Sequence, residues 1–400
     1  MSGREIVIQD IKKQAQIHEQ AIIALRRDFH EHPETSWEEV RTTEKIAEEL
    51  KKLGITILQQ GFKGTKSGIL AELDSGKPGP TVALRADIDA LNMLEEVDVE
   101  YKSKIDGKMH SCGHDSHTAM LLGAAMILVD LKDQWTGKVR FLFQPSEEAY
   151  PSGAKAMIAE GALQGIERIF GIHIFSALNK GTLLYRSGPF MAASDTWKAE
   201  IIGKGGHGSM PNATLDPTLP MAHFITGVQT IVSRELSSLD AGVVTVAGVQ
   251  TSSFVNNIIP ERVNLLGTCR SFTLEVRQHI EDSIKRIFAG VCQTYRCEGN
   301  FEWIPLMMPT INHPEVTEKM RKIGIELFGE ENVQESPLIP GSEDFGYYLN
   351  EIPGTYMIMG AGDEEKGIGQ SQHSPKFRLD ESVFKDGAAL HAAFVINYPK

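Results

Sequence analysis

The sequence predicts an α/β protein: a mixed sheet with helices on both faces, into which a smaller α+β domain is inserted. Apolar runs of strand length alternate with helical segments over residues 1–186, a pattern typical of a sheet with covering helices. The middle of the chain changes to a strand–helix–strand–strand–helix order, and residues 304–400 return to the first pattern.

The N-terminal part predicts two helices followed by alternating strands and helices. Helical patterns cover residues 5–31 and 37–53, and Gly54 ends the second of them. Apolar runs then predict strands at Gly68–Leu73, Thr81–Ala86, Val139–Phe143 and Arg168–Ile172, with an apolar helix over Thr118–Leu131.

The middle of the chain predicts an inserted domain with its own strands and helices. Strands are expected at Thr196–Gly203, Val243–Gly248 and Val263–Arg270, and helices at 217–238 and Leu274–Tyr295. Asp216 and Pro217 are a good N-cap and first-turn pair for the first of these helices. The order resembles a split βαβ, ferredoxin-like module.

We place the inserted domain at residues 187–303 and the first domain at 1–186 and 304–400. In its last part, the first domain is completed by a helix at 314–328, a strand at Thr355–Met359 and a closing helix at 380–397.

Charge and composition argue against several classes of partner. The formal net charge is −13, whereas nucleic acid or an anionic membrane would need a basic surface. Four cysteines are too few for a disulfide framework in a chain of 400 residues. The first residues lack the apolar region of a signal peptide, and no apolar run reaches the roughly 18 residues of a membrane span. We therefore expect a cytoplasmic protein.

Residue types that bind metals recur just beyond the predicted strands, where open α/β sheets place their ligands, and just before the predicted helix Thr118–Leu131. They are Asp87, Asp89, Cys112, His114, Glu147, Glu148, His173 and His373. Cys112 and His114 form the most specific pattern. A thiolate and an imidazole two residues apart, with Gly113 between them, can occupy neighbouring coordination positions of one metal ion. The alternative for this pair is a helix N-terminus rich in polar caps.

Glu147 and Glu148 suggest one metal ligand and one general base. Two carboxylates after Pro145 can both turn toward one site, and two divalent cations would offset their charge. A solvated loop is the alternative.

The histidines leave further alternatives open. His173 follows a buried strand, and the alternative to metal binding is a core histidine with a hydrogen-bond partner. For His373 the alternative is an ordinary surface residue. His30 and His32, near Pro33, are expected to be structural.

Three residues of the inserted domain are candidates for contact with a substrate. The glycines around His207 predict a tight turn that presents this side chain. Asn257 and Arg270 could recognise a substrate carboxylate, or they could serve local turn and sheet hydrogen bonds.

Taken together, these segments resemble the metal-dependent aminoacylases, which include hippurate hydrolases and plant auxin–amino-acid-conjugate hydrolases. These enzymes are relatives of the carboxypeptidase G type of di-metal exopeptidase. The matching segments are Arg27–Pro33, Leu84–Leu91, His110–Thr118, Phe143–Glu148, Gly205–Pro211, Asn257–Arg270, Gly341–Phe345 and His373–Pro375. They follow the family order over nearly the whole chain, and chance would not give all eight in order.

The resemblance implies a catalytic domain of the zinc-exopeptidase type with an inserted lid and dimerisation domain. It implies two divalent metal ions (Zn, Mn, Co or Ni), with Glu147 as the general base and a thiolate between the metals. The implied metal ligands are Cys112, His114, Glu148, His173 and His373. It also implies that His207 stabilises the oxyanion and that Asn257 and Arg270 hold the substrate carboxylate.

The implied reaction is cleavage of the amide bond of N-acyl-L-amino acids, with acetyl, benzoyl or similar acyl groups, by metal-activated water. A homodimer or homotetramer through the lid domain is expected. The nearest rival is a dipeptidase or carboxypeptidase that uses the same site. A non-catalytic metal-dependent binding protein is disfavoured, because it would have no need of Glu147 beside Glu148.

Overall fold

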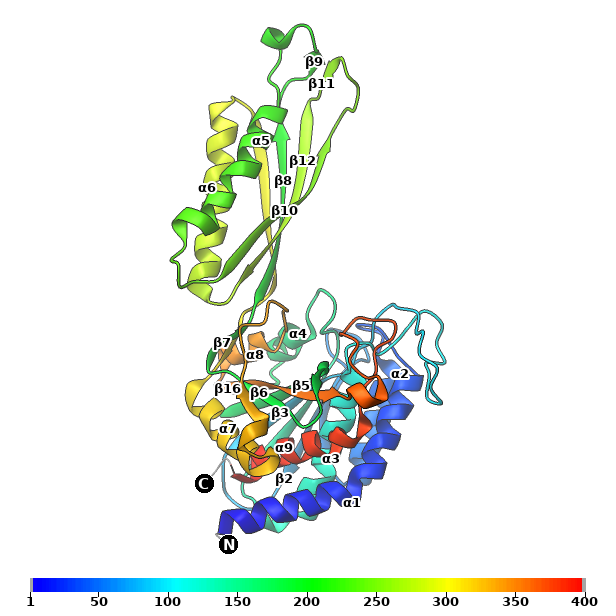
Figure 1. Cartoon of the computed structure of the whole chain (residues 1–400). Helices are drawn as coiled ribbons and strands as arrows, with labels where there is room; N and C mark the ends of the chain where they lie inside the picture. The colour runs from blue at the N-terminus through cyan, green and yellow to red at the C-terminus, as the bar shows by residue number, and fades with distance from the viewer. Residues whose placement is uncertain (1–2, 398–400) are drawn as a thin grey trace. The chain divides into compact units, whose positions relative to one another are not determined.

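The computed structural model describes residues 3–397 and divides the chain into two compact units (Figure 1). The large unit comprises the chain up to Gly188, Asn312–Pro337, and the chain from Asp344 onward. The small unit comprises Pro189–Ile311 and Leu338–Glu343. Within the described part of the chain, no helix is both long and apolar enough to cross a membrane.

The large unit is built on an eight-stranded mixed sheet. In sheet order its strands are β1 (Thr56–Gln60), β2 (Ile69–Asp74), β4 (Lys138–Gln144), β3 (Thr81–Asp87), β5 (Arg168–Asn179), β16 (Gly354–Gly362), β6 (Leu183–Tyr185) and β15 (Val333–Glu335). The four central strands, β4, β3, β5 and β16, run parallel. Their carboxyl ends therefore meet at one edge of the sheet.

Helices cover both faces of this sheet. They are α1 (Gly3–Glu31), α2 (Val40–Lys52), α3 (His114–Asp130), α4 (Gly153–Ala159), α7 (Pro314–Phe328), α8 (Gly346–Glu351) and α9 (Phe384–Asn397). Every residue of β16 is buried, although successive side chains of a strand point to opposite faces. In β5, Phe170 packs against Phe394 of α9, while Gly171 faces the Phe345 ring next to α8.

The start of α3 depends on a glycine. Gly113 precedes the helix with φ of 90°, in the left-handed region that a side chain disfavours. A Cβ atom at this position would lie 2.7 Å from Cγ2 of Ile174 on β5. Gly113 therefore lets the turn that carries Cys112 and His114 approach β5 closely.

The small unit is a four-stranded antiparallel sheet with two helices. The sheet order is β10 (Gly242–Thr251), β12 (Arg262–Ser271), β8 (Ala193–Ile202) and β13 (Glu298–Met307). Helices α5 (Thr218–Gly227) and α6 (Leu274–Thr294) pack with these strands around a core that includes Trp197, Phe224 and Phe288. The chain order strand–helix–strand–strand–helix–strand is that of a split βαβ module.

Short strands complete the chain. β9 (Gly206–His207) pairs with β11 (Ile258–Ile259) in the small unit. β7 (Gly188–Met191) and β14 (Thr310–Asn312) lie where the chain crosses between the units.

Two elements of the small unit differ from expectation. The segment 217–238 is not one helix: α5 ends at Gly227, and a π-helical turn follows at Ile231–Glu235. Strand β13 was not predicted. It extends past residue 303, the expected end of the inserted domain, to Met307. It is an edge strand with Pro305 at a register shift, where a missing backbone donor is tolerated.

Candidate metal centre

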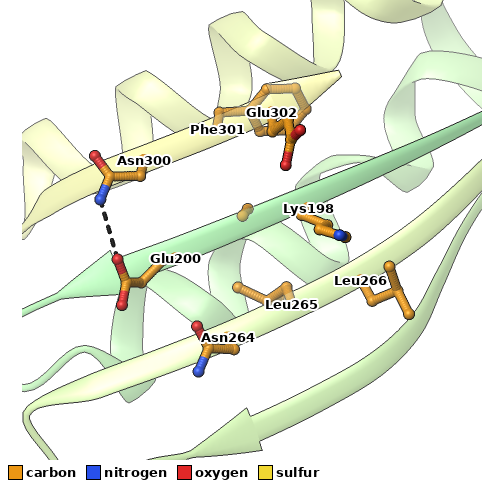
Figure 2. Close-up of a pocket in the computed structure, with 9 residues that line it drawn as sticks. Lys198, Glu200, Asn264, Leu265, Leu266, Asn300, Phe301 and Glu302 are labelled. Carbon is orange, nitrogen blue, oxygen red and sulfur yellow. Dashed lines mark hydrogen bonds between the residues drawn. The ribbon is translucent and has the colours of Figure 1, made fainter. Parts of the chain in front are cut away.

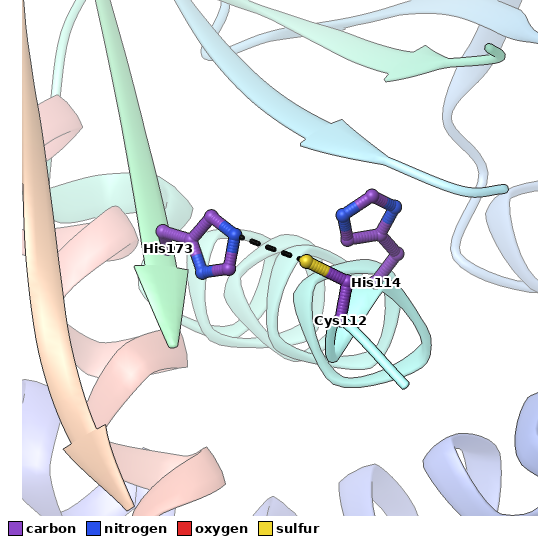
Figure 3. Close-up of side chains that lie close together, drawn as sticks. All are labelled: Cys112, His114 and His173. Atoms are coloured by element: carbon purple, nitrogen blue, oxygen red, sulfur yellow. Dashed lines mark hydrogen bonds between the residues drawn. The ribbon is translucent and has the colours of Figure 1, made fainter. Parts of the chain in front are cut away.

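Five side chains that the sequence singled out lie together in the large unit. His173 lies in the middle of β5, because this strand continues to Asn179 and does not end at Ile172 as expected. The ligand atoms of the five side chains form two groups, each within 4.8 Å: Cys112 with His114 and His173, and Cys112 with Glu148 and His373. Figure 3 shows the first group, with Cys112 and His114 at the start of α3 facing His173 on β5. Cys112 belongs to both groups, so its sulfur could touch two ions.

Cys112 is buried beside carboxylates. Its Sγ lies 3.5 Å from Nε2 of His173. Burial, together with the negative charges of Glu148 and Glu147, raises the pKa of the Cys112 thiol well above its ordinary value. A thiolate here needs a nearby positive charge, which a divalent cation would supply.

The ring of His173 has a fixed tautomer. Its Nδ1 lies 2.9 Å from the main-chain oxygen of Ile174, and a carbonyl can only accept. Nδ1 therefore carries the proton, and the Nε2 lone pair faces Cys112. Burial also lowers the pKa of His173 well below its ordinary value, which favours this neutral ring.

His114 is oriented by an aspartate. Its Nδ1 is 3.1 Å from Oδ1 of Asp89. Its Nε2 is buried and has no hydrogen-bond partner among the described residues. Burial by itself lowers the pKa of His114, but Asp87 and Asp89 raise it to about 10. A cation at Nε2 would displace the proton that these carboxylates attract.

The second group joins two loops. Nε2 of His373 lies 3.1 Å from Oε1 of Glu148. His373 has φ of 62°, a conformation that is uncommon outside glycine, and its N–H donates to the main-chain oxygen of Ser111 at 2.8 Å. Glu148 is held by its own N–H, which donates to Asp89 at 3.0 Å.

Another acid–histidine group in the same region is less suited to a metal. Asp87, His114 and His117 also have ligand atoms within 4.8 Å. However, Nε2 of His117 accepts from the N–H of Ile174 at 2.9 Å, so its proton is on Nδ1, 2.6 Å from Asp87. Asp87 in turn accepts from Arg85 at 2.7 Å. Both nitrogens of His117 are therefore engaged by protein.

Glu147 lies beside these groups, and the turn that carries it is fixed. It is buried and has an oxygen within 4.8 Å of ligand atoms of His114 and Glu148. The preceding Ser146 has φ of 50°, and its N–H donates to the buried Glu39 at 2.8 Å. Burial and the charge of Asp89 raise the pKa of Glu39 to about 8.

The three candidates of the small unit have a different environment. His207 is exposed, and its Nδ1 contacts the hydroxyl of Ser209 at 2.8 Å. The exposed Asn257 uses its main-chain oxygen to accept from Gly208 at 2.8 Å. Arg270 donates to the hydroxyl of Thr268 at 2.7 Å and to its neighbouring carbonyl, Cys269, at 2.8 Å. In this structure Arg270 therefore makes the local hydrogen bonds that were its alternative role.

A separate hollow of about 570 Å³ lies on the sheet of the small unit (Figure 2). It lies on β8, β12 and β13, and within it Asn300 donates to Glu200 at 3.0 Å. Its lining includes none of the candidate site residues.

Several residues shape the centre through contacts that the sequence did not predict. Asp89 orients His114 and the Glu148 loop, and Asp87 orients His117. Their position directly after a buried strand was the available signal. Glu39 had no such signal, because its contact with Ser146 arises only in the folded chain.

The donor set fits two divalent cations. Nε2 of His173 is unprotonated, and Nε2 of His114 can exchange its proton for a cation. The thiol of Cys112 belongs to both ligand groups, and Glu148 adds a carboxylate. Thiolate, imidazole and carboxylate are the ligands that zinc and related ions bind.

Comparison with known proteins places this centre in a family. The chain matches Peptidase family M20/M25/M40 over residues 83–397. It is 39% identical to thermostable carboxypeptidase 2 of Saccharolobus solfataricus, over 98% of this chain and 99% of that protein. It is 38% identical to the N-acetylcysteine deacetylase of Bacillus subtilis, over 94% of this chain and 96% of that protein.

A solved structure supports the same assignment. The YXEP protein of Bacillus subtilis, described as a dinuclear metal binding peptidase, superposes with a TM-score of 0.84 at 32% identity. The match covers 96% of this chain and 99% of that one. The predicted fold class and hydrolase activity are thereby confirmed, and the chain belongs to Peptidase family M20/M25/M40.

Proposed function

We propose that this chain cleaves the amide bond of N-acyl amino acids, with Glu147 as general base beside two divalent metal ions. The proposed ligands are Cys112, His114, Glu148, His173 and His373. The observation that carries the proposal is the pair of ligand groups that share Cys112 next to Glu147. The names of the deacetylase and of the dinuclear relative support the same reading.

A pair of divalent ions in such a site acts as a Lewis acid and lowers the pKa of water. Zinc, manganese, cobalt and nickel all accept this mixture of sulfur, nitrogen and oxygen ligands. The thiolate of Cys112 and the three imidazoles favour these ions over magnesium or calcium, which prefer oxygen.

The proton transfers fall to Glu147. As the water oxygen attacks the amide carbon, Glu147 takes a proton from it. It then gives this proton to the amide nitrogen as the carbon–nitrogen bond breaks. The products are a carboxylic acid and a free amino acid, so atoms and charge balance. The fixed backbone of Ser146 and Glu148 on either side holds Glu147 in one place for both transfers.

The small unit is proposed to supply substrate contacts. His207 would stabilise the oxyanion, and Asn257 and Arg270 would hold the substrate carboxylate. His207 pairs with Ile258 across the β9–β11 ladder, so it and Asn257 share one end of the unit. Arg270 pairs with Ser194 at the opposite end of β12, so it and Asn257 would hold one carboxylate only if they came from two copies of the chain. Arg270 would also have to exchange its bonds to Thr268 and Cys269 for the substrate. Assembly as a homodimer or homotetramer through residues 187–303, and a cytoplasmic location, remain predictions.

A panel of substrates tests the proposal against its rival. The chain, loaded with Zn²⁺ or Mn²⁺, is assayed on acetyl-, benzoyl- and indoleacetyl-amino acids and on free dipeptides. We expect kcat/KM to be higher for the N-acyl amino acids. Higher values for peptides would favour the carboxypeptidase alternative, to which the name of the Saccharolobus relative points. No hydrolysis of either class would contradict both.

A further inference from the structure

The two proposed ligands His173 and His373 belong to different ligand groups, yet their orientations depend on one residue between them. Ile174 follows His173 on β5, and its main-chain oxygen accepts from Nδ1 of His173 at 2.9 Å. The same oxygen accepts from the side-chain amide of Gln372 at 2.9 Å. Gln372 immediately precedes His373.

The backbone of Ile174 is held from its other side as well. Its N–H donates to Nε2 of His117 at 2.9 Å, and Nδ1 of His117 lies 2.6 Å from Asp87. Asp87 accepts from Arg85, which also donates to Asp344 at 2.8 Å. These four side chains, Ile174 and both histidine ligands lie in the large unit. Ile174 is therefore a fixed point, so a group anchored to its oxygen is anchored to the sheet.

The loop that carries His373 needs such an anchor. His373 adopts a positive φ, which persists only where the surroundings impose it. Its loop leaves β16 at Gly362, and three main-chain contacts tie the part near His373: His373 N–H to Ser111, Pro375 oxygen to the N–H of Glu96, and Gln370 oxygen to Ser176. Gln372, next to His373, is tied through its side chain instead.

We infer that Gln372 is a positioning residue that aligns His373 with the sheet-borne ligands through the oxygen of Ile174. Without its amide, the ring of His373 has more freedom, and the group made by Cys112, Glu148 and His373 loses affinity for its ion. The group made by Cys112, His114 and His173 keeps its own contacts with Asp89 and Ile174. The inference rests on the proposed two-metal function.

Stepwise titration of the metal-free full-length chain with Zn²⁺ tests this role. Gln372→Met keeps the length of the side chain but removes the amide. We expect one Zn²⁺ to bind as in the unsubstituted chain and the other about 10–100-fold more weakly, the usual cost of losing a group that orients a ligand. The thermal unfolding midpoint of the metal-free protein should stay the same.

Gln370→Met is the matched control, because the side chain of Gln370 is exposed in the same loop and only its main-chain oxygen is used. Equal Zn²⁺ affinities in the Gln372 and Gln370 variants would overturn the role of Gln372. Should Gln372→Met fail to fold, Gln372→Asn, whose amide falls short of Ile174, must show the same selective loss. An unsubstituted chain that binds fewer than two Zn²⁺ would instead contradict the proposed function.

Discussion

The large and small units differ in how firmly they hold their candidate site residues. In the large unit, His114 and His173 are buried and each has one ring nitrogen engaged by a protein oxygen. In the small unit, His207 and Asn257 are exposed, and Arg270 is bonded to its own strand. His373 of the large unit is also exposed, but its main chain is fixed by the bond from its N–H to Ser111. The large unit therefore carries a preorganised centre, whereas the small unit carries groups that are exposed or engaged in local hydrogen bonds.

This difference predicts how substitutions divide between the units. Rigid donor groups lose little entropy when they bind an ion or a transition state, so the large unit should set metal affinity and the chemical step. Exposed residues of the small unit should change turnover or KM and leave metal binding unchanged.

The largest effect is expected at Glu147. Glu147→Gln removes the proton acceptor but keeps the shape of the side chain, so kcat should fall by about 10²–10⁴-fold. The number of Zn²⁺ ions bound should stay at two, measured by elemental analysis. Glu365→Gln, an exposed residue of the same unit, is the control and should have normal turnover. Near-normal turnover of Glu147→Gln would remove Glu147 from the mechanism.

The next largest effect is expected at His207, and it best distinguishes the roles of the two units. His207→Ala should lower kcat by about 10²–10³-fold, the usual loss when one oxyanion donor is removed. Zn²⁺ affinity should be unchanged, because His207 belongs to neither ligand group. His223→Ala, an exposed histidine on α5, should have no such effect. Weakened Zn²⁺ binding in His207→Ala would break the division between the units.

Metal binding to the large unit should depend on pH. The pKa of His114 is about 10 and that of Cys112 is raised, so both hold protons in the metal-free protein at neutral pH. Both must lose them to bind an ion, and affinity should therefore rise with pH. Calorimetry in buffers of different ionisation enthalpy should find about two protons released near pH 7. Release of none would contradict the assignment of these two ligands.

The smallest effect is expected on the free energy of unfolding and arises from a buried histidine of α9. Burial lowers the pKa of His391 on α9 to about 3. Because the unfolded chain binds this proton more readily, the free energy of unfolding falls as pH drops from about 6.5 toward 3. At pH 5 the loss from this group is about 2 kcal/mol. Denaturant unfolding of His391→Leu should show a loss between pH 7 and 5 that is smaller by this amount, and an unchanged pH dependence would contradict it.

The same contrast describes what the sequence could predict. Strands such as Thr81–Asp87 are buried on both faces and contain mostly apolar residues, here with Arg85 among them, so they and the polar residues after them could be predicted from the sequence. Edge strand β13 has an exposed pattern broken by Pro305 and carries no such signal. The contacts that orient the ligands, from Asp89, Glu39 and Gln372, join distant segments and appear only when the sheet is assembled.

Anomalous diffraction from crystals of the Zn²⁺-loaded protein tests the shared thiolate most directly. We expect two zinc peaks roughly 3.5–4 Å apart. Each should lie about 2.3 Å from Sγ of Cys112, one with His114 and His173 and the other with Glu148 and His373. A single peak, or peaks that leave Cys112 unligated, would contradict the account.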